Sequence, residues 1–124
     1  MELKPDMYVR FKKGKVIYVR KLLEVIHHFE TFNVYRTDKE YFDYEEKDYF
    51  DVVYPDDIIS EPSYDIVDLI EVGDYVNGDK IIEKINNTLY IESANYIGDK
   101  TFILDSDIKS IVTKEEFESM EYEL

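Results

Sequence analysis

The sequence predicts a mainly β protein that consists of two tandem copies of one small β-barrel unit, followed by a short C-terminal helix. Two observations support this prediction. The 124 residues include 12 tyrosines and 7 phenylalanines, and aromatic and β-branched residues favour strands. The same order of turns and apolar segments also occurs twice along the chain. A chain of this length accommodates one ordinary domain or two very small ones.

The repeat is visible at the start and at the end of each half. Residues 3–17 align with 70–82, because both contain a Tyr-Val strand, a turn and a β-branched strand. Residues 51–63 align with 101–113 through an Asp-Ile turn and a Ser or Thr that can cap a helix. We therefore expect a first domain over 1–65 and a second over 66–124.

In the first half, apolar alternation and turn residues predict a series of short strands. A basic turn is expected at 10–14. Strands are expected over 15–26, with a helix over 19–26 as the alternative, and over 29–37 and 49–54. Pro55 ends the last of these strands. A 3₁₀ turn or short strand should follow at 56–60, and Ser63 should cap a short helix or turn over 64–69.

In the second half, Asn-Gly and Asn-Asn pairs predict tight turns, because these residues tolerate positive φ. Strands are expected over 75–76, 80–85 and 88–93, with a further hairpin over 96–104. Thr113 and Glu116 have the spacing of a capping box. The chain should therefore end in a helix over 114–121.

The net charge of −14 is unevenly distributed. Residues 1–28 carry +4 and the remainder carries −18. A large negative charge repels nucleic acid and attracts basic surfaces, although it can also serve solubility alone. The basic N-terminal patch could bind nucleic acid. The overall charge instead favours a patch that faces the acidic half of the same chain, or an acidic second copy in a homodimer.

Several classes of chemistry have no support in the sequence. The chain has no cysteine, which excludes disulfides, thiolate metal sites and cysteine catalysis. No Gly-rich phosphate loop or Gly-x-Ser-x-Gly motif is present. His27 and His28 are the only histidines, and neighbouring side chains on a strand point to opposite faces. We expect no enzymatic activity, no cofactor, and neither catalytic nor metal-binding residues. No signal peptide or membrane-length apolar segment is recognisable, so a cytoplasmic protein is expected.

The best candidate for a functional surface is an acidic and aromatic insert over 38–50, which has no counterpart in the second half. Insertions in repeat units usually map to exposed loops. Carboxylates on a rigid surface can imitate phosphates, and tyrosines supply contact area at low entropic cost. The alternative is a solvated loop that maintains solubility. The predicted partner-binding residues are Asp38, Glu40, Tyr41, Asp43, Tyr44, Glu45, Glu46, Asp48 and Tyr49.

Two resemblances add to this prediction. The Val-Gly-Asp-Tyr-Val segment that ends at Val76, with the strand meander that follows, resembles SH3-like small barrels. Residues 65–78 and 111–120 are similar to segments of small acidic proteins of unknown function from phages and prophages of low-GC Gram-positive bacteria. This second resemblance implies a phage origin and the cytoplasm of a bacterial host. Phage accessory proteins of this size and charge include inhibitors of host defence, among them anti-CRISPR proteins.

The expected function is that of a non-enzymatic phage accessory protein that binds a basic protein surface. Such a protein could inhibit a nucleic-acid-targeting defence complex of the host by nucleic-acid mimicry. One alternative is a protein that sequesters a signalling nucleotide, with the N-terminal Arg and Lys residues holding its phosphates. Another alternative is a structural or assembly accessory protein without a ligand.

Overall fold

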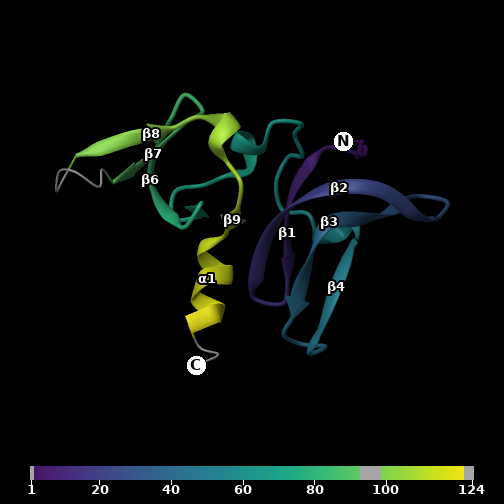
Figure 1. Ribbon diagram of the computed structural model, residues 1–124. Coiled ribbons are helices and arrows are strands. Elements are labelled where there is room, and N and C mark those ends of the chain that lie inside the picture. Colours follow the sequence, from purple (N-terminus) through teal and green to yellow (C-terminus); the bar gives the residue numbers. More distant parts are fainter. Residues whose placement is uncertain (1, 93–98, 122–124) are drawn as a thin grey trace.

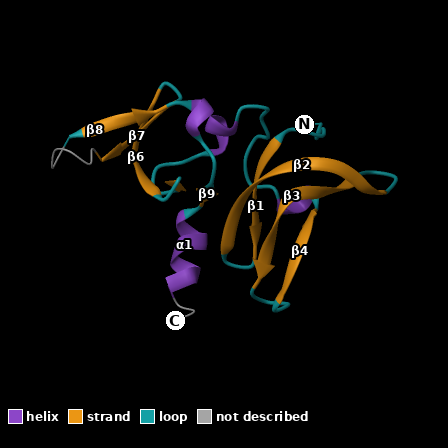
Figure 2. Ribbon diagram, in the orientation of Figure 1, coloured by secondary structure: helices purple, strands orange, loops and turns teal. Residues whose placement is uncertain are grey.

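The computed structural model describes residues 2–92 and 99–121. The chain forms two antiparallel sheets, and one short helix lies between them near the C-terminus (Figures 1 and 2). The first sheet has the strand order β1-β2-β3-β4, and the second has the order β8-β7-β6-β5-β9. The strands of the first sheet are β1 (Tyr8–Lys13), β2 (Val16–His28), β3 (Asn33–Asp43) and β4 (Asp48–Val53). Those of the second are β5 (Tyr75–Val76), β6 (Asp79–Ile85), β7 (Thr88–Glu92), β8 (Lys100–Ile103) and β9 (Ile111–Val112).

The first hairpin joins β1 to β2 through a two-residue turn. Lys13 pairs with Val16, and Gly14 has φ +62, a conformation that glycine adopts without steric cost. The hairpin turn predicted at 10–14 is therefore present, but it is shorter and lies at residues 14 and 15. Residues 10–13 continue the strand because Val9 and Phe11 both belong to the first core.

The second hairpin joins β2 to β3 and extends away from the rest of the molecule (Figure 1). β2 is a single 13-residue strand, which excludes the helix considered for 19–26. The partner strand begins at Asn33, later than predicted. Residues 29–32 form the turn instead, where the Phe29 N–H donates to the Phe32 carbonyl at 2.8 Å and the two rings stack.

The connection between the halves runs back along β1. After a 3₁₀ turn over Pro55–Asp57 (η1), Ile58 forms a bridge with Phe11, and Ser63 forms a bridge with Tyr8. The 3₁₀ turn that was predicted for this region is confirmed. A second 3₁₀ turn, Ile66–Leu69 (η2), is capped by Asp65, whose carboxylate accepts the Val67 N–H at 3.1 Å. The cap predicted at Ser63 is wrong because that hydroxyl accepts the Asp65 N–H instead.

The second half follows its predicted elements closely. Asn77-Gly78 and Asn86-Asn87 all have positive φ and form the two expected tight turns. The hairpin predicted over 96–104 is described only from residue 99, and 96–98 lie outside the described residues. A 3₁₀ turn, Asp105–Asp107 (η3), precedes β9. The helix α1 (Lys114–Glu121) begins as predicted, and the Glu116 N–H donates to the Thr113 hydroxyl at 3.1 Å.

The two halves share an order of elements. Each has four consecutive antiparallel strands, a 3₁₀ turn, and an extended segment that returns to pair with the first strand. Each also has its own hydrophobic cluster. The first contains Val9, Phe11, Val16, Tyr18, Leu22, Tyr35, Tyr41 and Val53, and the second contains Val67, Ile70, Val76, Ile81 and Leu89. Both sheets are open over the residues that the structure describes.

Candidate functional site

The predicted insert forms the tip of the third hairpin, between β3 and β4. Asp43 pairs with Asp48 across the hairpin. The Asp43 carboxylate accepts the N–H groups of Glu45 at 2.9 Å and Glu46 at 3.2 Å. These bonds fix the turn, because an aspartate side chain that accepts nearby amides stabilises a tight turn. The insert is therefore an ordered hairpin end.

Exposed aromatic and acidic side chains meet at this tip. The ring of Phe42 lies edge-to-face between Tyr44, at 4.8 Å between centroids, and Tyr49, at 5.1 Å. Tyr49 is 64% exposed and Tyr44 is 36% exposed. The exposed carboxylates of the same turn are Glu45, Glu46 and Asp48. We use the name hairpin tip for these five residues: Tyr44, Glu45, Glu46, Asp48 and Tyr49.

Four of the predicted residues lie outside the hairpin tip, among them Asp43, whose carboxylate holds the turn. Tyr41 is 3% exposed, so it cannot anchor a partner. Its ring packs against Phe11 and Tyr18 in the first core, and burial raises the pKa of its hydroxyl. Asp38 and Glu40 are exposed but precede the tip in β3, and the Asp38 carboxylate accepts the Lys21 N–H at 2.9 Å.

A cavity of about 260 Å³ lies beside the hairpin tip. Its walls come from β2, β3, β4 and α1. The residues that line it are Tyr18, Arg20, Lys39, Glu40, Tyr41, Phe42, Tyr44, Tyr49 and Glu116. Phe42 could have been found from the aromatic density of the insert, but Arg20 and Glu116 carried no sequence signal for this site. We call this space the tip cavity.

Glu116 is the most unusual residue of the tip cavity. Its carboxylate lies 3.6 Å from the Arg20 guanidinium, and its Oε1 is buried without a hydrogen-bond partner. Burial raises the pKa of Glu116, although the charges of Arg20 and Lys39 and the backbone of Thr113 act in the opposite direction. A buried acceptor without a partner is uncommon in folded proteins and calls for an explanation.

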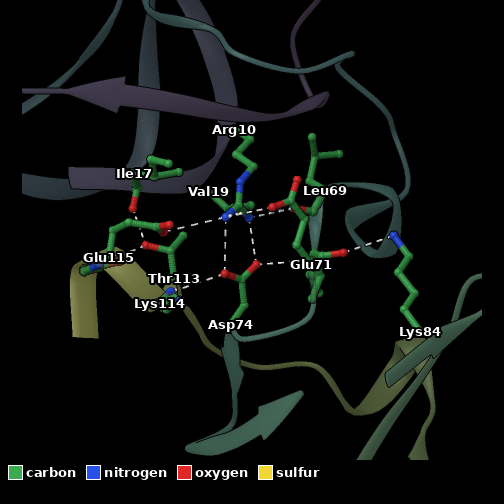
Figure 3. Close-up of polar contacts among 12 residues, drawn as sticks. Arg10, Ile17, Val19, Leu69, Glu71, Asp74, Lys84, Thr113, Lys114 and Glu115 are labelled. Atoms are coloured by element: carbon green, nitrogen blue, oxygen red, sulfur yellow. Dashed lines mark hydrogen bonds and ion pairs between the residues drawn. The ribbon is translucent and has the colours of Figure 1, made fainter. Parts of the chain in front are cut away.

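The basic N-terminal patch has a structural role at Arg10, whose side chain crosses to the second half (Figure 3). Its guanidinium binds the Asp74 carboxylate through two nitrogens, at 2.7 and 3.3 Å, and donates to the Leu69 carbonyl at 3.1 Å. Burial disfavours the charged guanidinium and acts to lower its pKa. The hydrogen bonds and charge of Asp74, together with the charges of Glu71 and Glu115, outweigh this effect, so the pKa of Arg10 is raised. The expectation that the patch faces the acidic half is confirmed here.

Arg20 is also held by hydrogen bonds, but to backbone carbonyls of the first half. Its guanidinium donates to the backbone carbonyls of Val19, Lys39 and Glu40, at 3.0 to 3.3 Å. Both arginines of the patch are buried. They are therefore not available to neutralise the phosphates of a nucleic acid, which requires exposed cations.

A second cavity, of about 190 Å³, lies between the two halves. Its lining includes four cationic residues, Arg20, Lys21, Lys39 and Lys109, and one acid, Asp38. The remaining lining comes from both halves, with Tyr8 from β1 and Ile111 from β9. The lining of this cavity is mainly positive, although the net charge of the protein is strongly negative.

Among the described residues, no group of histidine, aspartate and glutamate side chains is arranged to hold a metal ion. None of the helices that these residues form is long and apolar enough to cross a membrane. Comparison with protein-family models, with curated proteins and with solved structures found no match for this chain.

Proposed function

We propose that this protein is non-enzymatic and binds a basic surface of another protein through the hairpin tip. The observation that carries the proposal is the arrangement of two exposed tyrosines and three exposed carboxylates on one ordered turn. A few residues near the centre of an interface, often tyrosines, supply most of its binding energy. Surrounding charges steer a partner of opposite sign and fix its orientation.

Two further features support binding at this position. The turn is held by Asp43, and both tyrosines pack on Phe42, so little conformational entropy is lost when a partner binds. The two arginines of the basic patch are buried inside the molecule. Each contacts a carboxylate there, Arg10 with Asp74 and Arg20 with Glu116, so these two cations do not add positive charge to the surface that a partner meets.

The resemblance to phage accessory proteins narrows the proposed partner. Carboxylates spaced along a rigid turn can occupy positions that phosphates take on a basic, nucleic-acid-binding surface. We propose that the partner belongs to a host complex that targets nucleic acid, and that the protein inhibits this complex by nucleic-acid mimicry, as an anti-CRISPR protein does.

We also infer that the two halves are copies of one SH3-like unit, divided at residues 65 and 66. The support is the shared order of four strands, a 3₁₀ turn and a returning segment. On this inference the hairpin tip is an elaboration of the first copy, because the corresponding strands of the second copy are shorter.

The test uses a fluorescent hexa-arginine peptide as a basic probe, with binding measured by anisotropy at about 50 and about 300 mM salt. The variant Glu45→Gln/Glu46→Gln/Asp48→Asn removes three charges from the hairpin tip. We expect roughly tenfold weaker binding, since each exposed charge contributes up to about 1 kcal/mol.

The matched control is Glu61→Gln/Asp79→Asn/Asp105→Asn, which removes three exposed carboxylates elsewhere. It should change the affinity less than twofold. Equal losses in the two variants would mean that the probe responds only to net charge, and the proposed surface would then be wrong.

The cavity between the halves favours a second candidate function, the sequestration of a signalling nucleotide. Its three lysines, Lys21, Lys39 and Lys109, would hold phosphates. A cyclic nucleotide should then raise the unfolding temperature of the protein, because a ligand that binds only the folded state stabilises it. No such shift is expected if the protein acts only through the hairpin tip.

A further inference from the structure

The tip cavity has walls suited to a cationic side chain. Its volume of about 260 Å³ far exceeds the ~15 Å³ that one water requires. Phe42, Tyr44 and Tyr49 contribute aromatic rings beside an opening at the hairpin tip. Aromatic faces attract ammonium and guanidinium groups, most strongly where water is excluded.

The cavity also contains an acceptor that the protein leaves unused. Glu116 Oε1 is buried and accepts no hydrogen bond, although Arg20 lies near the other oxygen of the same carboxylate. A buried carboxylate oxygen without a donor costs free energy. A donor supplied by a partner would remove this cost.

Arg20 and Lys39 are the two cations already present in the cavity, and they differ in how firmly they are held. Arg20 is fixed by three backbone carbonyls. Lys39 is exposed, and within the described residues its ammonium makes no hydrogen bond and no close ion pair. The charge of Lys39 acts to lower the pKa of Glu116. Lys39 therefore interacts with this carboxylate electrostatically, without a hydrogen bond to it. A lysine without such contacts can be displaced by an incoming cation.

We propose that the tip cavity receives one lysine or arginine side chain of the basic partner, which stacks on Tyr44 or Tyr49 and donates to Glu116. This inference rests on the proposed function and identifies the central contact of that interface. Exposed carboxylates Glu45 and Glu46 on the same turn would guide the incoming cation.

The test compares two variants of cavity residues with the hexa-arginine peptide as the probe. Glu116→Gln keeps the shape of the side chain and removes its charge, and it should weaken binding roughly tenfold, because a charge-assisted hydrogen bond is lost. Lys39→Gln removes the competing cation and should strengthen binding, by about threefold. The matched control is Glu118→Gln, an exposed carboxylate on α1, which should leave the affinity unchanged.

The outcomes separate this inference from the proposed function. If Lys39→Gln weakens binding of the peptide, Lys39 does not compete with the incoming cation and the inference is wrong. If the two cavity variants have no effect while the triple hairpin-tip variant weakens binding, the cavity inference fails and the proposed surface stands. If only the cavity variants change the affinity, the proposed surface fails. Lys39 is exposed, so its variant tests the inference even if Glu116→Gln disturbs the packing of α1.

Discussion

Arg10 and Arg20 both contact carboxylates of the second half, and the contacts Arg10–Asp74 and Arg20–Glu116 differ in how completely they are bonded. At Arg10, both guanidinium ends bind Asp74, which is 1% exposed. The Asp74 carboxylate also accepts the backbone N–H groups of Glu71 at 2.9 Å and Lys114 at 3.2 Å. Both carboxylate oxygens of Asp74 therefore have donors inside the protein.

The contact between Arg20 and Glu116 is incomplete. The guanidinium donates mainly to backbone carbonyls, the carboxylate lies 3.6 Å away, and Glu116 Oε1 has no donor. Glu116 also lines the tip cavity, whereas Asp74 lines no cavity described above. The comparison indicates that the Arg10 contact stabilises the arrangement of the halves. The Arg20 contact leaves the acceptor Glu116 Oε1 without a donor, as the proposed binding of a partner's cation requires.

The largest effect is expected when the Arg10 contact is broken. Arg10→Met leaves Asp74 buried without its cation, which should lower the free energy of unfolding by about 3–5 kcal/mol. Urea unfolding followed by circular dichroism measures this change. The double variant Arg10→Met/Asp74→Leu removes both charges and should recover most of the loss. A loss below about 1 kcal/mol would contradict a structural role for this contact.

An intermediate effect is expected at Thr113, which supports both contacts from the start of α1. Its hydroxyl donates to the Ile17 carbonyl in β2 and accepts the Glu116 N–H. Thr113→Ala should lower the free energy of unfolding by about 1–2 kcal/mol, the usual cost of losing a helix cap. Ser119→Ala, on the same helix, is the control and should cost less. If both variants cost the same, the connection between Thr113 and β2 contributes nothing.

The smallest effect is a change in pH dependence at Glu116. Because its pKa is raised in the folded protein, the folded state holds this proton more tightly than the unfolded chain does. Its stabilising contribution is complete below the ordinary glutamate pKa and is lost as pH rises through the folded value. Glu116→Gln does not titrate, so its stability relative to wild type should increase as the pH rises from the ordinary glutamate pKa to the raised pKa of the folded protein. Urea unfolding across this range measures the difference, and a decrease would contradict the assignment.

The sequence was most informative where structure depends on neighbouring residues. Asn77-Gly78 predicted its turn because both positions need positive φ, and Thr113 with Glu116 predicted the start of α1. The acidic insert was expected in an exposed loop, but only residues 44–47 form the turn, because 38–43 and 48–50 belong to β3 and β4. The wrong predictions concern burial. Tyr41 was expected on the surface because it lies among acids, but strand alternation turns it towards Phe11 and Tyr18.

The sequence by itself determined the mainly β character, the positions of the tight turns and the helix at the end of the chain. These features follow from φ preferences and from periodicity over a few residues, and the chain carries both locally. Only the tertiary structure decided that Arg10 meets Asp74 and that Glu116 lies beside the hairpin tip. Such contacts join residues more than 60 positions apart. They depend on how the halves pack, and no local pattern specifies that packing.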